Sequence, residues 1–138
     1  MRVPAWVRTT GFVDERDRAD LLAAAEVVAL PSRYESLSLV ALEAWSAGRP
    51  TLANARCEVL AGQTARSGGG LLYDGPDEYA RQLSRLAGDD ELRALLGDAG
   101  RRFADAQTWP SAARRWRALL ARLRRPVSPG RAPTPARP

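Results

Sequence analysis

One stretch of the chain, residues 30–54, restricts the possible folds more than any other. The apolar run over residues 27–30 stops at Pro31, and a polar turn follows it. A helical spacing of apolar residues begins after this turn and ends at Gly48, two residues before a proline that cannot continue a helix. A second apolar run begins at Thr51. The order predicts a strand, a loop, a helix and a second strand, which together form a βαβ unit with a right-handed crossover.

The predicted helix of this unit has one apolar face and a polar start. Leu39, Leu42 and Trp45 repeat at the spacing of a single helical face. Ser36 and Ser38 are both of a residue type that caps the start of a helix well. Amide groups at such a start have no partner within the helix, and together with the helix dipole they favour an anion such as phosphate. We therefore expect an anion-binding loop directly before this helix.

Two glutamates frame the loop and the helix. Glu35 lies in the loop, and Glu43 lies inside the helix eight residues later. Eight helical residues rise by about 12 Å, but Glu35 need not be helical, so both carboxylates can face one crevice at the carboxyl end of the strand. Open parallel sheets bind their ligands in that crevice. The spacing therefore indicates a ligand site that uses both carboxylates.

This pattern resembles the donor-sugar motif of retaining, nucleotide-sugar-dependent glycosyltransferases with two Rossmann-like domains, the GT-B fold. The family is glycosyltransferase family 4, also called glycosyl transferases group 1, of the type with two glutamates separated by seven residues. The residues that carry the resemblance are Pro31-Ser32, Glu35, Glu43-Ala44 and Gly48-x-Pro50. Further similar stretches are Gly11-Phe12-Val13, residues 23–28, residues 57–60 and residues 69–73. The similarity covers about residues 5–120.

The resemblance implies an α/β fold class. We expect a partial Rossmann-like parallel sheet with flanking helices, equivalent to the C-terminal half of a GT-B donor domain, followed by C-terminal helices. The predicted domain covers residues 1–125, and the Pro- and Arg-containing tail of residues 126–138 is expected to be disordered. The sequence has no room for the acceptor-binding N-terminal domain, nor for the Arg and Lys that the family keeps on the donor diphosphate.

The resemblance also implies roles for the two glutamates. Glu43 would accept hydrogen bonds from the ribose hydroxyls of the donor nucleotide, and its alternative role is that of a solvated helix carboxylate. Glu35 would be the catalytic residue: it would accept hydroxyls of the transferred hexose and stabilise positive charge that develops on the sugar ring. The alternative for Glu35 is a loop carboxylate that caps the following helix, and both roles are compatible.

Backbone and apolar residues complete the implied site. Ser36, Leu37, Ser38 and Leu39 would bind the donor diphosphate through their amide groups. Family members often have Gly at the position of Ser38, and Ser narrows the backbone conformations available there. Val13, at the end of a predicted strand beside Phe12, would border the nucleobase, and core packing is the alternative for both residues.

The remaining elements follow from local signals along the chain. Leu21, Leu22 and the two tryptophans Trp109 and Trp116 are expected to pack into the core. The predicted elements are a strand that ends near Val13, a helix over Asp14–Ala25, a short helix over Arg56–Gln63, a Gly-rich loop over Thr64–Gly70, a strand over Leu71–Tyr73, and helices over Asp77–Ala87, Glu91–Ala106 and Trp109–Arg125.

Composition removes several kinds of chemistry. The chain has no His and one Cys, so an internal disulfide is excluded and metal or Cys–His chemistry is not expected. No cofactor is expected, and only carboxylates, Tyr and Arg remain as side chains for acid–base catalysis. The chain has no run long enough to span a membrane and no signal peptide at its start, which predicts a cytoplasmic protein.

Charge is distributed unevenly along the chain. Residues 1–100 hold 11 Arg against 15 acidic residues, whereas residues 101–138 hold 10 Arg against Asp105. A basic end can meet nucleic acid or an anionic membrane surface, or it can be a solvated helix face with a tail. We expect no nucleic acid partner, and we keep contact with a membrane surface as a possibility.

Two functions follow from these expectations. The first is the donor-binding part of a glycosyltransferase that moves a hexosyl group with retention from a nucleoside diphosphate sugar to an unknown acceptor. This part would be inactive without the missing N-terminal domain or a partner chain that supplies it. The second is a degenerate, non-catalytic domain that acts as a binding or interaction module.

Overall fold

A three-stranded parallel sheet forms the centre of the computed structural model, which describes residues 4–123. The strands β1 (Val28–Leu30), β2 (Thr51–Asn54) and β3 (Gly70–Tyr73) lie in that order, with Thr51 paired to Val28 on one side and to Gly70 on the other. Helix α2 (Leu39–Ser46) connects β1 to β2. The predicted βαβ unit and the predicted α/β fold class are therefore confirmed.

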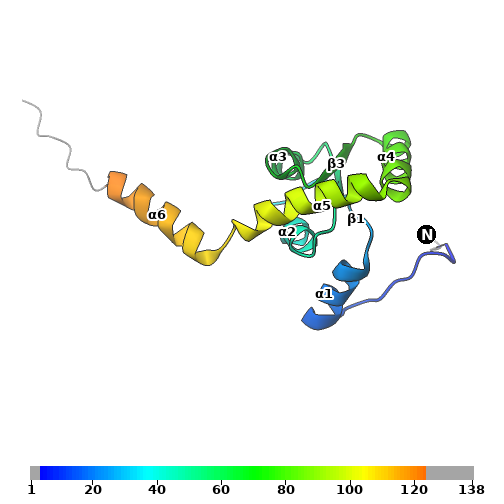
Figure 1. Ribbon diagram of the computed structural model, residues 1–138, viewed down its shortest axis with the longest axis horizontal. Coiled ribbons are helices and arrows are strands. Elements are labelled where there is room, and N and C mark those ends of the chain that lie inside the picture. Colours follow the sequence, from blue (N-terminus) through cyan, green and yellow to red (C-terminus); the bar gives the residue numbers. More distant parts are fainter. Residues whose placement is uncertain (1–3, 124–138) are drawn as a thin grey trace, which may run out of the picture. The chain divides into compact units, whose positions relative to one another are not determined.

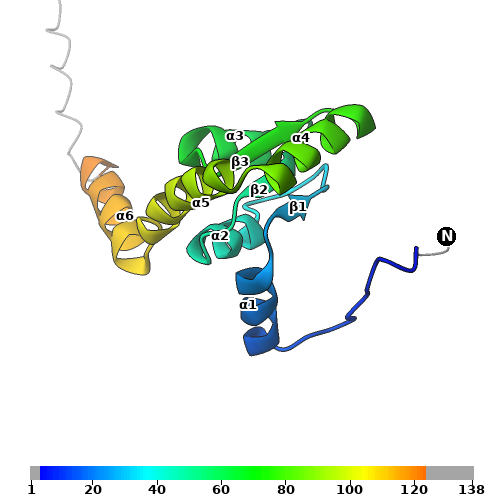
Figure 2. The same cartoon turned by 45° about the vertical axis from the view of Figure 1, so that its right-hand side comes forward.

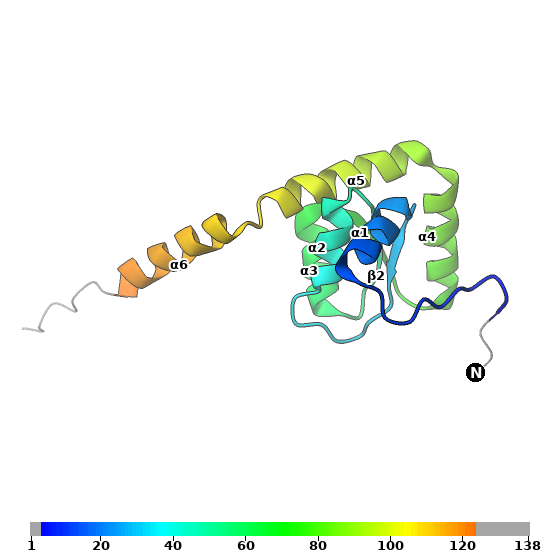
Figure 3. The same cartoon turned by 90° about the horizontal axis from the view of Figure 1, so that it is seen from below.

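Five further helices surround or follow the sheet. They are α1 (Glu15–Ala24), α3 (Glu58–Ser67), α4 (Pro76–Gly88), α5 (Asp90–Asp105) and α6 (Trp109–Leu123). Contacts divide the chain into Met1–Ala106, which holds the sheet, and Gln107–Pro138, which holds α6 (Figure 1). Within the first unit, α2 and α3 lie on one side of the sheet and α4 on the other, as Figure 3 shows.

The core centres on Trp45 of α2, which is completely buried. The indole Nε1 donates a hydrogen bond of 2.8 Å to the carbonyl of Gly69, and the ring meets Phe103 edge-on at 5.8 Å. Helix α5 approaches this ring closely, because a β-carbon added at Gly100 would lie 2.5 Å from Trp45 Cδ1. A β-carbon at Gly97 would likewise collide with the Gly48 carbonyl. These contacts lie where β2 and β3 begin, so α5 packs at the amino ends of the strands. It does not cover their carboxyl ends.

Several helix ends that local sequence signals predicted are confirmed by the structure. Gly48 follows α2 with a φ of 70°, a left-handed conformation that glycine adopts readily at helix ends. Asp14 caps α1, because its Oδ1 accepts a 2.8 Å hydrogen bond from the amide of Asp17. Pro76 begins α4. These three signals act within a few residues, which explains why sequence alone predicts them.

Other predictions were wrong. Residues 7–14 form no strand, and Phe12 is 99% exposed, so the predicted strand near Val13 is absent and Phe12 does not pack into the core. Leu21 and Leu39 are also exposed rather than inward-facing. Helix α3 extends to Ser67 and takes most of the predicted Gly-rich loop, because Gln63, Thr64 and Ser67 form a buried face of that helix. A strand or an apolar face needs a distant partner, and periodicity does not identify that partner.

Predictions for the C-terminal part have mixed outcomes. Trp109 and Trp116 are 90% and 64% exposed, so the prediction that they pack into the core is contradicted. The proposed disordered tail, residues 126–138, lies outside the described residues. The predicted domain boundary at residue 125 stays a prediction. Across residues 4–123, no helix combines the length and the apolar character needed to cross a membrane.

Candidate functional site

A pocket of about 470 Å³ lies between α1 and α2, and Glu43 is part of its wall. Figure 2 shows the two helices beside one another. Arg18 of α1 points to Glu43, with 3.1 Å between Arg18 Nη2 and Glu43 Oε1. The other carboxylate oxygen, Oε2, is buried and accepts no hydrogen bond from the residues that the structure describes. The pocket therefore contains the Glu43 carboxylate, in which Oε1 is paired with Arg18 and Oε2 can still accept a hydrogen bond from a ligand.

A buried acceptor without a partner is unfavourable, because burial removes its hydrogen bonds to water. A ligand hydroxyl that enters the pocket would supply the missing donor. Vicinal hydroxyls, as in a ribose, suit a carboxylate especially well, and carboxylates recognise ribose in other α/β sites. The geometry around Glu43 is thus compatible with the role predicted for it, although the role itself stays a prediction.

Arg18 is the residue of this pocket that sequence reasoning missed. It lies 25 positions before Glu43, in a helix whose neighbouring positions are mostly acidic or small. The only available signal was that two basic residues, Arg16 and Arg18, interrupt the acidic first half of the helix. That signal does not say which carboxylate the Arg meets, because the contact depends on how α1 packs on α2.

The loop before α2 has an unusual backbone at Ser38. Its φ of 55° and ψ of 72° are left-handed, and Ser38 is the only non-glycine residue with a positive φ among residues 4–123. Capping residues usually have an extended backbone, and here the Ser38 side chain makes no capping hydrogen bond to α2. The Ala41 amide donates a 3.2 Å hydrogen bond to the Ser38 carbonyl, so the amides of Leu39 and Val40 are the ones that remain available to an anion.

A side chain of α3 forms a hydrogen bond with the backbone of this loop. Gln63 is 4% exposed, and its Nε2 donates a hydrogen bond to the carbonyl of Leu37. Because that carbonyl is engaged with α3, the backbone of the loop is fixed at the residue before Ser38. Gln63, which sequence reasoning did not single out, therefore fixes the backbone of the predicted diphosphate-binding loop at Leu37.

The remaining predicted site residues are less closely grouped. Leu39 is exposed and lines the same pocket as Glu43. Glu35 is partly buried in the loop and has no ion-pair partner among residues 4–123, and it is not part of the pocket wall. Ser36 and Leu37 are exposed, and Val13 is partly buried in the segment before α1. The structure brings Glu43 and Leu39 together in one pocket, and the roles assigned to all of these residues stay predictions.

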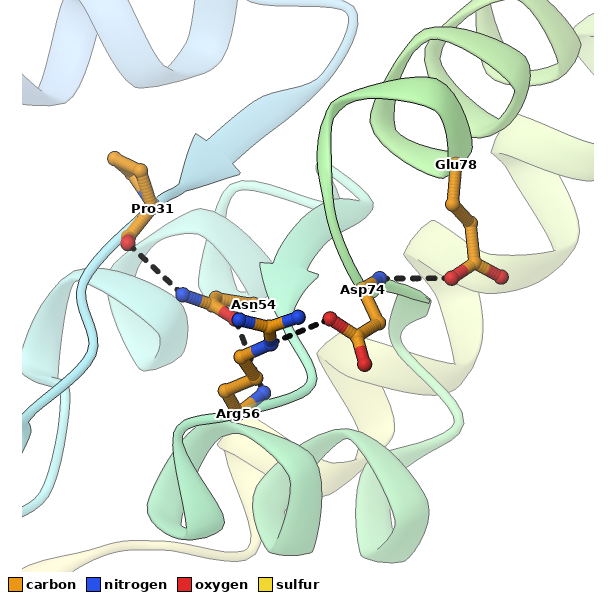
Figure 4. A network of polar contacts seen from close by, with 5 residues as sticks. All are labelled: Pro31, Asn54, Arg56, Asp74 and Glu78. Atoms are coloured by element: carbon orange, nitrogen blue, oxygen red, sulfur yellow. Dashed lines mark hydrogen bonds and ion pairs between the residues drawn. The ribbon is translucent and has the colours of Figure 1, made fainter.

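A network of polar contacts joins the carboxyl ends of all three strands (Figure 4). Asn54, the last residue of β2, donates from Nδ2 to the carbonyl of Pro31 over 3.2 Å and accepts at Oδ1 from the amide of Arg56. Arg56 Nε lies 2.5 Å from Asp74 Oδ1, and the Asp74 amide donates to Glu78 over 2.7 Å. The loops that follow β1, β2 and β3 are therefore linked to one another at the edge where parallel sheets bind ligands.

A second pocket, of about 410 Å³, lies at this edge. Its wall includes Arg33, Arg56, Tyr73 and Tyr79, and the two tyrosine rings meet edge-on with 4.9 Å between their centres. Burial, and secondarily the neighbouring Tyr79, raises the pKa of the Tyr73 phenol above its usual 10.0. The phenol therefore stays neutral up to a higher pH than an ordinary tyrosine does.

Known proteins are similar to this chain in sequence and in fold. Residues 2–89 match the family described as "Glycosyl transferases group 1". A D-inositol 3-phosphate glycosyltransferase of Corynebacterium glutamicum is 39% identical over 107 residues, which cover 74% of this chain and 25% of that protein. The protein of the same name from Streptomyces coelicolor is 40% identical over 111 residues, which cover 78% of this chain and 24% of that protein.

Solved structures agree with the sequence matches. Sucrose-phosphate synthase from Thermosynechococcus elongatus superposes with a TM-score of 0.71 at 30% identity, over 83% of this chain and 29% of that one. WaaG, a glycosyltransferase involved in lipopolysaccharide biosynthesis, superposes with a TM-score of 0.62 at 27% identity, over 78% of this chain and 30% of its own. The chain spans about a quarter of the length of the curated relatives it matches. With its α/β fold and a family match over residues 2–89, this chain belongs to the glycosyl transferases group 1 family.

Proposed function

We propose that these 138 residues are the donor-binding part of a retaining glycosyltransferase that takes a hexosyl group from a nucleoside diphosphate sugar. The observation that carries the proposal is Glu43, whose Oε2 is buried without a partner in the pocket between α1 and α2. A nucleoside contributes the hydroxyl pair that this oxygen lacks. The family to which the chain belongs supports the same ligand class.

Each part of the donor then meets a different part of the site. The ribose hydroxyls donate to Glu43 while Arg18 holds the other carboxylate oxygen. The diphosphate lies against the amides at the start of α2, where the helix dipole and unpaired N–H groups favour negative charge. Glu35, in the loop before these amides, accepts the hydroxyls of the hexose and stabilises positive charge that develops on the sugar ring. The acceptor approaches from outside the described residues.

Nucleotide binding to the purified chain tests the donor site. Isothermal titration with UDP, GDP and ADP is expected to give binding of at least one nucleotide, with a Kd at least roughly tenfold higher for Glu43→Gln, because hydrogen bonds to a charged group contribute about 1.5–3 kcal/mol each. Glu26→Gln is the matched control, since Glu26 is exposed and outside the pocket. Absence of binding to all three nucleotides, or equal affinity of the two variants, would refute the assignment.

The chain alone is expected to transfer no sugar at a useful rate. Holding an acceptor oxygen in a near-attack position lowers a barrier by up to roughly 7–11 kcal/mol, and residues 4–123 form one parallel sheet without a second one that would hold the acceptor. The measurement is release of nucleoside diphosphate from UDP-glucose and GDP-mannose, with and without candidate acceptors. Acceptor-dependent turnover that Glu35→Gln removes would show that the site is sufficient by itself.

The second candidate function is a non-catalytic interaction module. It is favoured by β1 and β3, which are both edge strands of the sheet within residues 4–123. An open edge presents unpaired backbone groups to another chain. Light scattering after size-exclusion chromatography distinguishes the two functions, because a stable monomer that binds nucleotide favours the donor-binding part, and an oligomer without nucleotide affinity favours the module.

A further inference from the structure

We propose that Gln63 is a positioning residue for the donor diphosphate, because it holds the loop before α2 in the conformation that presents free amides to an anion. The inference rests on the proposed function, since it concerns the phosphates of the donor. Gln63 belongs to α3 and is not part of the wall of either pocket. It would therefore act through the backbone of the loop and not by contact with the ligand.

The loop over residues 32–37 is held to the rest of the fold at one point. Gln63 is 4% exposed, and its Nε2 donates a hydrogen bond to the carbonyl of Leu37, 26 positions earlier in the chain. Within residues 4–123, this is the only hydrogen bond that the structure shows to the backbone of residues 32–37. Leu37 is itself 50% exposed, so packing of its side chain does little to fix the loop.

The residue that follows this point has a backbone that needs support. Ser38 has a φ of 55° and a ψ of 72°, and a non-glycine residue disfavours such a left-handed conformation roughly five- to thirtyfold. Conformations of this kind persist where the surrounding structure fixes them. The Ser38 carbonyl is fixed by the amide of Ala41, and the Leu37 carbonyl, in the peptide group before Ser38, is fixed by Gln63. Ser38 is thus held between two hydrogen bonds.

The conformation of Ser38 determines how the loop and the start of α2 face a diphosphate together. The amides of Leu39 and Val40 come after Ser38, and the amides of the loop come before it. If Ser38 leaves the left-handed region, the loop turns relative to the helix, and an anion that contacts both loses part of its hydrogen bonds. The apparent affinity for a diphosphate then falls in proportion to the fraction of molecules with the loop in place.

The other end of the Gln63 amide indicates that this side chain contributes little net stability. Its Oε1 is buried and accepts no hydrogen bond from residues 4–123. A buried acceptor without a partner disfavours the folded state and opposes the gain from the bond to Leu37. Replacing Gln63 by Met, which is flexible and of similar length, removes both contributions. We therefore expect a loss of diphosphate affinity without a matching loss of stability.

The test compares a nucleoside diphosphate with its own nucleoside on the full chain. The pair is chosen as the one of UDP, GDP and ADP that binds most tightly, and calorimetric or NMR titration gives both Kd values. The variants are Gln63→Met, Glu43→Gln and the matched control Gln82→Met, which makes the same chemical change in α4, outside both pockets. Circular dichroism and urea unfolding verify each fold, and Gln63→Asn, whose shorter amide does not reach Leu37, replaces Gln63→Met if the latter does not fold.

Gln63→Met is expected to raise the Kd of the diphosphate roughly five- to thirtyfold and to leave the Kd of the nucleoside within roughly twofold of the wild type. Glu43→Gln should raise both Kd values by a similar factor, because both ligands carry the ribose. Gln82→Met should change neither. The urea midpoint of Gln63→Met should stay near that of the wild type.

A second substitution distinguishes a held loop from a general loss of structure. Glycine adopts the left-handed conformation without the steric cost that Ser38 has, so it needs the hydrogen bond from Gln63 less. The double variant Ser38→Gly with Gln63→Met should therefore bind the diphosphate within roughly threefold of the wild type. A purely structural role of Gln63 would give no such rescue.

The outcomes separate this inference from the proposed function. Nucleotide binding that Glu43→Gln weakens and Gln63→Met does not would overturn the role of Gln63 and leave the donor site in place. Equal weakening of nucleoside and diphosphate by Gln63→Met, or no rescue by Ser38→Gly, would assign Gln63 to the fold alone. If the wild-type chain bound no nucleotide, the proposed function would fail and this inference with it.

Discussion

Ser38→Gly should stabilise the protein, because Ser38 has a left-handed backbone that glycine adopts without a steric cost. Its φ is 55°, and its side chain does not cap α2. The β-carbon of an L-residue in this conformation crowds the following carbonyl oxygen. Replacing the residue by glycine removes that crowding and removes no capping hydrogen bond.

The size of the effect is a difference between two opposing contributions. A left-handed non-glycine residue costs about 1–2 kcal/mol, and the added freedom of glycine in the unfolded chain costs about 0.4–1 kcal/mol. The two ranges leave a net gain in the free energy of unfolding between about 0 and 1.6 kcal/mol, with a midpoint of about 0.8 kcal/mol. For a unit of this size the midpoint corresponds to an increase in Tm of about 3–6 °C.

Urea unfolding of the wild type, Ser38→Gly and Ser38→Ala measures this difference. Alanine keeps the β-carbon and therefore the crowding, so its midpoint should stay near that of the wild type, while the glycine variant should have a higher midpoint with an unchanged slope. Nucleotide affinity should also be retained, because the diphosphate meets amide groups and not the Ser38 hydroxyl. A glycine variant that is less stable than the alanine variant would refute the reasoning.

Three further predictions concern the core, the pocket and the sheet edge. Trp45→Ala should lower the free energy of unfolding by about 3–5 kcal/mol in urea, because it empties a fully buried site, and a loss below about 1 kcal/mol would contradict the packing described. Arg18→Gln should change stability by less than about 1 kcal/mol, since the pair with Glu43 is half-exposed, yet it should weaken nucleotide binding in titration calorimetry. The raised pKa of Tyr73 contributes stability that is fully present below the unfolded value of 10.0 and is lost as the pH rises through the folded value. Between pH ~9 and ~11 the urea midpoint of the wild type should therefore fall more steeply than that of Tyr73→Phe.

The parts of the fold that were predicted correctly depend on short-range signals. The chain after the first strand of the βαβ unit must turn at Pro31, and Gly48 with the following proline must end α2. Such signals restrict the backbone of one or two residues directly. The positions of β1, α2 and β2 follow from them with an error of one or two residues.

The parts that sequence reasoning missed depend on which distant groups meet. Residues 7–14 have strand-like composition but no strand to pair with, and Leu39 lies at the pocket rather than in the core. The contact between Arg18 and Glu43 and the contact between Gln63 and Leu37 join different helices and loops. A carboxylate can be predicted to bind a ligand from a motif, whereas the group that orients it appears only with the packing of the helices.

The weak attachment of α1 gives the pocket a property of its own. None of the residues of α1 is buried, and the ion pair of Arg18 with Glu43 fastens the helix to α2 at a half-exposed position. In contrast, every residue of β2 is buried. Amide hydrogens of α1 should therefore exchange with solvent through local opening, and those of β2 only when the whole unit unfolds. Since α1 forms one wall of the pocket, the apparent affinity of any ligand there equals the intrinsic affinity multiplied by the fraction of molecules with α1 in place. Salt, which weakens the ion pair, would then lower the affinity for a ligand by shifting that population, even for a ligand without charge.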